Sequence, residues 1–322
     1  MIQTATSSID SRISVGPPTN KRLTEEIPRI SVCVCTFKRP ELLERLLVSL
    51  SIQRTEGQFS FDIVVSDNDA AQSARPVVDA FSASSPVSVT YCTEPRQNIA
   101  LARNQAIAHS DGDYIVFVDD DEFASDSWLH SLLTACLAHG AEGVLGPVKP
   151  FFESEPAQWV KKGRFFERPN YATGRRVGWT ECRTGNVLFK KAILDGCDMP
   201  FRAEFGTAGE DMDFFRRMEQ KGCKFTWCSE AVVHEVIPPQ RCSLSFLLRR
   251  ALLRGSNFHK HPTNRIENLL RSLVAVPSYI LALPILALFS QHLFFRYLVK
   301  LCDHVSRLLA FAGWSVVTER ET

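Results

Sequence analysis

A run of four acidic side chains is the sharpest chemical signal in the sequence. An apolar stretch at residues 114–118 ends abruptly in Asp119, Asp120, Asp121 and Glu122. Adjacent carboxylates repel one another unless a cation neutralises them, and oxygen ligands of this kind suit Mg²⁺ or Mn²⁺. Because side chains alternate along an extended segment, we expect Asp119 and Asp121 to face a divalent cation and the phosphates of a ligand. Asp120 then faces the ribose or sugar of that ligand; a solvated acidic turn is the alternative.

A second acidic group opens a predicted helix. Gly209 is followed by Glu210 and Asp211, and apolar residues stand three, four and seven positions after Asp211. This spacing predicts a helix with one face in the core, and the helix dipole favours carboxylates in its first turn. We interpret Glu210 and Asp211 as catalytic, with Asp211 the general base that removes a proton from a hydroxyl group. A plain N-terminal helix cap is the alternative.

Five further residues are weaker candidates, because each taken alone is compatible with ordinary surface placement. Asp67 follows the second expected strand, where it would receive the N–H of a nucleotide base. Thr36 and Arg39 follow the first strand and would line the same crevice, and Arg103 would approach the base or the phosphates from a helix. His234 follows an apolar stretch and is a candidate third metal ligand, with a structural histidine as the alternative.

The elements that must position these residues alternate along the chain. Such an alternation of strands and helices specifies an α/β fold with a doubly wound, mainly parallel sheet. In sheets of this kind ligands bind at the carboxyl ends of the strands, which is where the candidate residues fall. Strands are expected at residues 30–35, 61–66, 88–92 and 114–118, and helices at residues 40–50, 76–81 and 98–109.

The chain divides into three expected parts. Residues 1–28 are rich in Ser, Thr and Pro without hydrophobic periodicity, and we expect a flexible segment there. Residues 29–240 form the α/β domain, and residues 241–322 form a basic and hydrophobic helical region. Inside the α/β domain, residues 151–179 are a long polar and aromatic stretch, which we expect to be a loop that covers an acceptor as a lid.

From Ile30 to about His234 the chain resembles glycosyltransferase family 2, which has the GT-A fold. The resemblance is carried by residues 35–40, by Asp67 with Asn68, and by residues 98–104. It is completed by the two acidic groups at residues 119–121 and 209–211. Within the family, Arg241 and the basic and hydrophobic tail are most similar to bacterial exopolysaccharide glycosyltransferases of the succinoglycan type.

This resemblance implies an inverting transfer of a sugar from a nucleotide diphosphate sugar to a hydroxyl group. It implies that Asp211 deprotonates the acceptor, that Asp121 holds the metal, and that Asp67 reads the base, commonly uracil. The chain lacks the Gln-x-x-Arg-Trp sequence of processive polysaccharide synthases, although Arg249 and Arg250 lie roughly where it would be. Addition of a single sugar is therefore favoured over polymerisation.

Composition excludes several other classes of protein. The 322 residues carry a net charge of only +1, which gives no electrostatic case for a nucleic-acid partner. The 10 cysteines form no C-x-x-C motif, so buried thiols in a reducing cytosol are favoured over a zinc site or a disulfide scaffold. Since the N-terminus has no apolar secretory segment, we expect the catalytic part to stay in the cytoplasm.

The last part of the chain suggests a membrane surface. Residues 241–322 contain 11 Lys and Arg against 4 Asp and Glu, an excess of +7, and residues 272–290 carry no charge. Pro277 and Pro284 interrupt this apolar run, so a crossing, a re-entrant hairpin and an in-plane helix all stay open. We expect association with the cytoplasmic face of the plasma membrane and an acceptor linked to a polyprenyl diphosphate; a soluble dimerisation helix pair is the alternative.

Two rival functions predict different observations. A nucleotidyltransferase also pairs a doubly wound sheet with metal-binding carboxylates, but it should carry a glycine-rich phosphate loop after its first strand. Residues 35–41 contain no glycine. A non-catalytic scaffold that binds a sugar nucleotide would keep its function when Asp211 is replaced by Asn.

Overall fold

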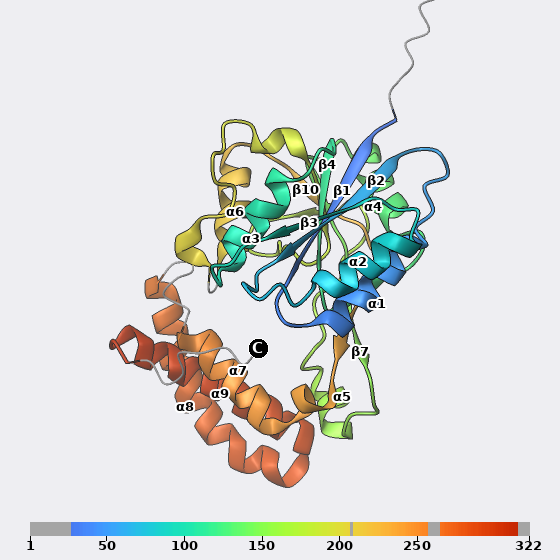
Figure 1. The fold of residues 1–322 in the computed structure, drawn as a ribbon. Helices are drawn as coiled ribbons and strands as arrows, with labels where there is room; N and C mark the ends of the chain where they lie inside the picture. The colour runs from blue at the N-terminus through green and yellow to red at the C-terminus, as the bar shows by residue number, and fades with distance from the viewer. Residues whose placement is uncertain (1–26, 207–208, 257–264, 315–322) are drawn as a thin grey trace, which may run out of the picture.

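In this computed structural model the described residues are 27–206, 209–256 and 265–314. Most of the expected flexible segment, residues 1–26, lies outside the described residues. Within them, an eight-stranded sheet forms the centre of the α/β part, with strand order β3-β2-β1-β4-β9-β6-β10-β8 (Figure 1). These strands are β1 (Arg29–Thr36), β2 (Ser60–Asp67), β3 (Val89–Thr93), β4 (Tyr114–Asp119), β6 (Gly143–Leu145), β8 (Arg176–Val177), β9 (Val187–Lys190) and β10 (Phe225–Trp227).

The sheet is parallel where the four predicted strands lie. β1 pairs in parallel with β2 and β4, and β2 pairs in parallel with β3. β9 runs antiparallel between β4 and β6. The register sets Thr36 opposite Asp67, and Cys35 opposite Asp119, so these strands end at one edge of the sheet. The predicted α/β fold is confirmed, and the candidate residues at the ends of these strands lie at one edge of the sheet.

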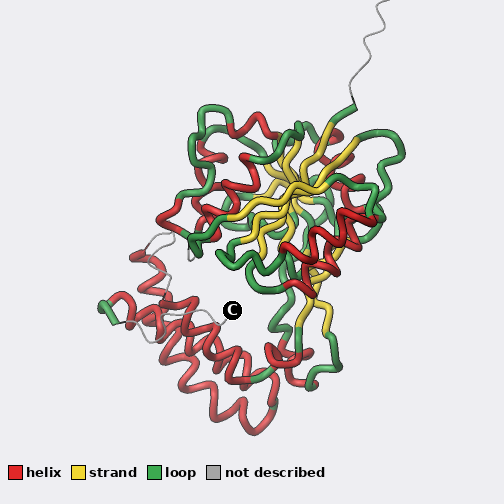
Figure 2. Tube along the Cα trace, viewed as in Figure 1, coloured by secondary structure: helices red, strands yellow, loops and turns green. Residues whose placement is uncertain are grey.

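Helices cover both faces of the central sheet (Figure 2). Two hydrophobic clusters form the core of this part. Because side chains alternate along β1, Val32 and Val34 lie in the first cluster and Cys33 lies in the second. Leucines of α1 and α4 fill the first cluster, and phenylalanines of α6 fill the second. The helices of this part are α1 (Pro40–Ser51), α2 (Arg75–Ser84), α3 (Ile99–Ala108), α4 (Trp128–Ala138) and α6 (Glu210–Gln220), with 3₁₀ turns at η1 (Lys191–Leu194) and η2 (Ala203–Phe205).

A second, three-stranded sheet extends from the end of β4. It has the order β5-β11-β7 and consists of β5 (Glu122–Ala124), β11 (Val233–Ile237) and β7 (Val148–Phe152). β5 begins inside the acidic run, and β11 pairs with it in antiparallel fashion. This small sheet therefore connects the acidic run to the segment that leaves the α/β part after β11.

The expectation of one long loop at residues 151–179 is wrong. The stretch contains the end of β7, the helix α5 (Gln158–Gly163) and the strand β8. Val160 and Phe166 are buried in a cluster with Ile237 and Leu247, and Trp159 packs against Phe295 with 4.6 Å between ring centroids. Because apolar side chains anchor it, the stretch joins the α/β part to the C-terminal helices, and we do not retain it as a lid.

After β11 the described residues are all helical or loop (Figure 2). A 3₁₀ turn, η3 (Pro239–Cys242), leads into α7 (Leu244–Ser256), α8 (Arg265–Phe289) and α9 (Gln291–Phe311). The contacts of α9 are with α5, α7 and α8. The expected boundary at residue 240 falls inside η3.

Candidate active site

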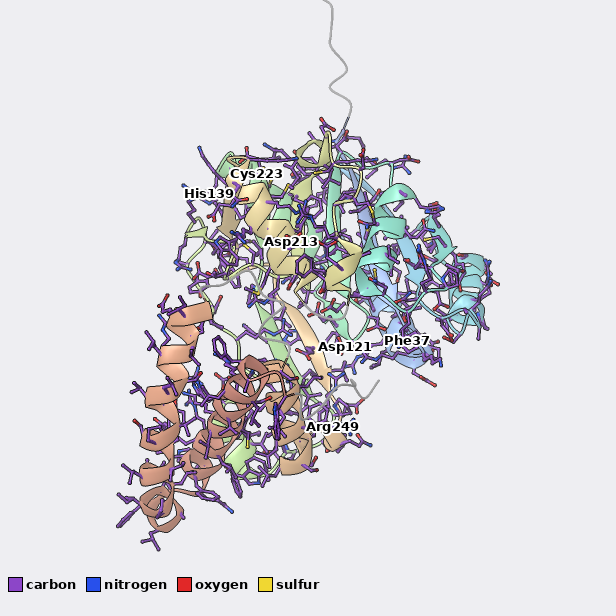
Figure 3. The ribbon with its side chains drawn as sticks, turned by 90° about the vertical axis from the view of Figure 1, so that its left-hand side faces the viewer. Phe37, Asp121, His139, Asp213, Cys223 and Arg249 are labelled. Carbon is purple, nitrogen blue, oxygen red and sulfur yellow. The ribbon has the colours of Figure 1, made fainter. Side chains whose placement is uncertain are left out.

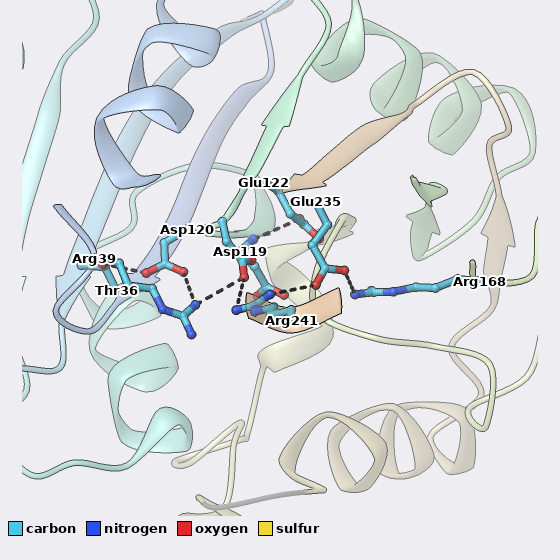
Figure 4. Close-up of polar contacts among 9 residues, drawn as sticks. Thr36, Arg39, Asp119, Asp120, Glu122, Arg168, Glu235 and Arg241 are labelled. Atoms are coloured by element: carbon cyan, nitrogen blue, oxygen red, sulfur yellow. Dashed lines mark hydrogen bonds and ion pairs between the residues drawn. The ribbon is translucent and has the colours of Figure 1, made fainter. Parts of the chain in front are cut away.

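We call Asp119, Asp120, Asp121 and Glu122 the acidic cluster. Two side chains from the first β–α connection reach it. The Oγ1 of Thr36, the last residue of β1, donates to Oδ2 of Asp120 at 2.8 Å. Nη1 of Arg39, just before α1, lies 3.2 Å from Asp120 and 3.4 Å from Asp121 (Figure 4). The structure thus brings these sequence candidates together, as parallel strands ending at one edge predict.

The C-terminal side of the chain also contributes to this cluster. Nη2 of Arg241, in η3, lies 3.2 Å from Oδ2 of Asp121, and its Nη1 lies 3.4 Å from Glu235. Nη2 of Arg168 donates to Oε2 of Glu235 at 2.6 Å (Figure 4). Our sequence reasoning did not assign Glu235, Arg168 or Arg241 to this cluster, since nothing in their spacing shows that three distant segments meet there.

Burial disfavours the charged forms of the carboxyl groups in the acidic cluster. It raises the pKa of Asp120 to about 6, although Arg39 opposes the shift. Burial also raises the pKa of Asp119 against the opposing charge of Arg103, and raises that of Glu122 well above its usual range. Oε1 of Glu122 is buried without a hydrogen-bond partner. The carboxyl groups of Asp119, Asp120 and Glu122 therefore keep their protons more readily than exposed ones do, chiefly because they are buried.

A hard divalent cation fits the chemistry of this cluster. The donor atoms are carboxylate oxygens, which Mg²⁺ and Mn²⁺ prefer, and one of them lacks a partner. Within the described part of the chain, no three His, Cys, Asp or Glu side chains are grouped closely enough to hold a metal ion. In this conformation Arg39 and Arg241 supply the positive charge beside Asp121.

His234, the expected third ligand, makes other contacts. Its ring stacks on Phe123 with 5.2 Å between centroids and 21° between planes. Burial, together with the charge of Lys149, lowers the pKa of His234. These contacts describe a packed structural histidine, and its metal role stays a prediction.

Asp67, the expected contact of a nucleotide base, is held by neighbouring groups in this structure. It is fully buried, and its carboxylate accepts from the hydroxyl of Tyr91 at 2.8 Å and from the backbone N–H groups of Ala74 and Asp69 at 2.9 and 3.0 Å. A carboxylate with these partners fixes the turn after β2. Its contact with a base stays a prediction.

Arg103, expected near a base or phosphates, forms a buried ion pair in this structure: its Nη1 donates to Oε1 of Glu210 at 2.5 Å. Its contact with a donor stays a prediction. Burial lowers the pKa of Arg103, but the charges of Glu210 and Asp119 more than offset this, so its pKa is raised. The pair fixes the start of α6 against α3. Glu210 is thus engaged in a close, buried ion pair, whereas the cation beside Asp211, Arg183, lies 3.8 Å away.

Asp211 stands at the first turn of α6. Gly209, with φ of 96°, takes the left-handed conformation that turns the chain into this helix. Burial and the adjacent charge of Glu210 raise the pKa of Asp211, while Arg183 and Arg103 oppose the shift. A carboxylate with a raised pKa is a better proton acceptor near neutral pH.

The two acidic groups are linked through one short loop and one arginine. Nε of Arg183 lies 3.8 Å from Asp211, and two residues later the backbone at Gly185 packs on Asp119, leaving no room for a Cβ atom. The charge of Arg103 acts on both Asp119 and Asp211. The two acidic groups therefore lie in one part of the structure.

Comparison with known proteins gives a consistent assignment. The model of the family "Glycosyl transferase family 2" matches residues 31–195. The succinoglycan biosynthesis protein ExoM of Rhizobium meliloti (strain 1021) is 36% identical over 233 residues, which cover 71% of this chain and 74% of ExoM. The chondroitin synthase of Pasteurella multocida (strain Pm70) is 24% identical over 255 residues, covering 69% of this chain and 26% of that synthase.

A solved structure supports the fold. The crystal structure of S. aureus TarS 1-349 in complex with UDP aligns with a TM-score of 0.51 and 16% identity, covering 88% of this chain and 90% of that chain. At this identity the likeness shows the fold, which is of the GT-A type. The family match covers about half of the chain and includes β1 through the acidic cluster. The chain therefore belongs to glycosyltransferase family 2 and is a glycosyltransferase.

Proposed function

We propose that this chain is an inverting glycosyltransferase that moves a sugar from a nucleoside diphosphate sugar, with UDP as the favoured nucleotide, to a hydroxyl of a lipid-linked glycan. The observation that carries the proposal is that Arg103 acts on both Asp119 and Asp211, while the loop with Arg183 beside Asp211 also places Gly185 against Asp119. The UDP bound to TarS favours uridine, and the similarity to ExoM favours exopolysaccharide or cell-surface polysaccharide synthesis.

The acidic cluster binds the donor in this proposal. Asp119 and Asp121 would hold Mg²⁺ or Mn²⁺, which supplies positive charge to the diphosphate as it leaves. Asp120, fixed by Thr36 and Arg39, contacts the ribose or the sugar of the donor. The guanidinium of Arg39 lies beside two of these carboxylates and carries the charge that a diphosphate requires.

Asp211 activates the acceptor. It accepts the proton of the acceptor hydroxyl while the oxygen attacks the anomeric carbon from the face opposite the diphosphate. The bond between that carbon and the diphosphate oxygen breaks, and its electron pair leaves with the nucleoside diphosphate. One displacement of this kind inverts the anomeric configuration. The raised pKa of Asp211 favours the proton transfer.

We also place the protein at the cytoplasmic face of the plasma membrane. All 10 cysteines are free, which suits a reducing compartment. Within the described residues, Ile266–Phe289 is the one helix long and apolar enough to cross a membrane, with a mean hydropathy of 2.1. A membrane-bound enzyme is suited to an acceptor carried on a polyprenyl diphosphate.

A panel of nucleotide sugars tests this function. The full chain is incubated with each donor and Mg²⁺ or Mn²⁺, and release of nucleoside diphosphate is measured without acceptor. Slow hydrolysis of one donor, removed by EDTA and restored by the metal, is the expected result. Binding of a donor without any turnover would favour the non-catalytic scaffold, and release of pyrophosphate from a nucleoside triphosphate would favour the nucleotidyltransferase.

A further inference from the structure

One side of α8 is a continuous apolar surface that nothing in the described structure covers. We define the outer face of α8 by its exposed apolar residues, which recur at intervals of three and four positions. Their exposure is high, reaching 75% at Leu281 and 82% at Leu288. The outer face consists of Ile266, Leu270, Leu273, Val274, Pro277, Ile280, Leu281, Pro284, Ile285 and Leu288.

The opposite side of α8 is fixed to α9. The hydroxyl of Ser272, which is fully buried, lies 3.0 Å from Nδ1 of His304. Tyr279 and Tyr297 pack edge to face with 5.2 Å between ring centroids. Since the residue numbers rise in α8 as they fall in α9, these contacts show that the two helices form an antiparallel hairpin.

The far side of α9 is fixed to α7. Nε of Arg254 lies 2.9 Å from Oδ1 of Asp303, and the hydroxyl of Ser306 donates to the carbonyl of Leu252 at 2.6 Å. A Cβ atom at Gly255 would lie 2.5 Å from the backbone carbonyl of Asp303, so the two helices are in close contact. α9 thus lies between α7 and α8, and α8 is the outermost layer (Figure 1).

We propose that α8 lies in the plane of the membrane, with its outer face in the hydrocarbon of one leaflet, and does not cross the bilayer. The proposal rests on the membrane association proposed above. α8 has 25 residues, or about 37 Å, so its length would permit a crossing. The hairpin excludes a crossing by α8, because α9 would then lie inside the bilayer beside α8. That would place Arg296, Lys300, Asp303 and Arg307 at hydrocarbon depth, where ionised groups are very unfavourable.

The two prolines inside α8 leave two backbone carbonyls without a helical donor. Pro277 and Pro284 have no N–H, so the carbonyls of Leu273 and Ile280 lose their usual partners. Both prolines are on the outer face of the helix. These carbonyls would meet hydrocarbon in an in-plane helix as well as in a crossing one, so the in-plane arrangement rests on the packing of α9 against α8.

A phospholipid surface fits the outer face better than a second copy of the chain. Protein interfaces surround an apolar centre with a polar rim, but residues 272–290 carry no charge. The surrounding region has an excess of +7, which complements anionic lipids. In Figure 3, Asp121 lies at the end of the α/β part that faces the C-terminal helices, so an acceptor held in this leaflet lies on the side of the site.

Charge substitutions on the outer face test the docking surface. The full chain and the variant L281K/L288K are mixed with vesicles of phosphatidylcholine and phosphatidylglycerol, and flotation measures the bound fraction. We expect the variant to bind at least about tenfold more weakly. The matched control is V48K/L137K, which alters apolar residues that are 57% and 59% exposed on α1 and α4 and should bind as the unsubstituted chain does. Equal loss in both variants would overturn the proposal.

A protease site inserted after Ser290 tests the orientation. Inside-out membrane vesicles from expressing cells present the cytoplasmic face to added protease. We expect cleavage before detergent is added, because the turn between α8 and α9 stays on that face. Cleavage only after detergent would show a crossing and overturn the proposal.

Two further outcomes keep this inference separate from the proposed function. An unsubstituted chain that binds no vesicles, but forms dimers that L281K/L288K abolishes, would show that a second copy covers the outer face. Nucleotide-sugar hydrolysis is measured on the same preparations. Retained hydrolysis with failed docking would overturn the membrane inference alone, whereas normal docking without hydrolysis would contradict the enzymatic proposal alone.

Discussion

The acidic cluster and the outer face of α8 differ in the kind of side chain that is unfavourably placed. In the cluster, charged side chains are buried, and Asp120 is only 5% exposed. On the outer face, apolar side chains are exposed, and Leu288 is 82% exposed. Neither arrangement is favourable for an isolated chain in water, because buried charge needs a counter-charge and exposed apolar surface needs cover. The comparison teaches that each region leaves a need unmet by the described chain, for which we propose a cation with a diphosphate in one case and lipid in the other.

The largest expected effect is the loss of turnover when Asp211 is replaced by Asn. D211N should lower turnover by about 10²–10⁴-fold, because the amide cannot accept the acceptor proton. Donor binding, measured by calorimetry, should stay within about twofold, since the acidic cluster is unchanged. The matched control is D79N on the exposed side of α2. Turnover of D211N close to that of the control would contradict the role of general base.

The neighbouring carboxylate should affect stability instead. E210Q leaves the buried guanidinium of Arg103 without its ion-pair partner, and we expect a loss of about 3 kcal/mol in the free energy of unfolding. Urea unfolding measures this value, with D79N expected within about 0.5 kcal/mol of the unsubstituted chain. If E210Q were as stable as that control, the ion pair would not fix the start of α6.

The buried cluster should give an unusual dependence of stability on pH. The pKa of Asp120 in the folded chain is about 6, above its value of about 3.9 in an unfolded chain, so the folded state binds more protons between these values. The free energy of unfolding should therefore rise by about 1.3 kcal/mol as the pH falls from 7 to 5 without metal. Thermal unfolding at both pH values measures the change. D120N should show a smaller rise, and an equal rise would assign it to other groups.

The smallest expected effect concerns the loop that joins the two acidic groups. A Cβ atom at Gly185 would lie 2.6 Å from Oδ2 of Asp119, so G185A must displace the end of that side chain, at a cost of about 1 kcal/mol in stability. G178A is the matched control, because the nearest atom to its Cβ would be 3.9 Å away. Similar unfolding midpoints for the two variants would show that the loop adapts and does not hold Asp119.

Predictions from the sequence succeeded where the signal was local. The strand that ends in the acidic cluster, and the start of α6 at Glu210, follow from hydrophobic spacing and helix-start chemistry. The sequence did not predict the structural partners of Asp67 and Arg103, which are Tyr91 and Glu210, because both lie far away in the chain. A carboxylate after a strand looks the same in sequence whether it faces a ligand or fixes a turn.

The sequence by itself determined the α/β order of elements, the edge of the sheet where carboxylates gather, and the apolar length of α8. These properties depend on spacing within a few residues, since the periods of strands and helices are local. Only the tertiary structure decided that Arg241 and Arg168 reach the acidic cluster through Asp121 and Glu235. It also decided that the charged helix α9 packs along α8, the fact from which we infer an in-plane helix. Contacts between distant segments depend on how whole elements pack, and no short stretch of sequence contains that information.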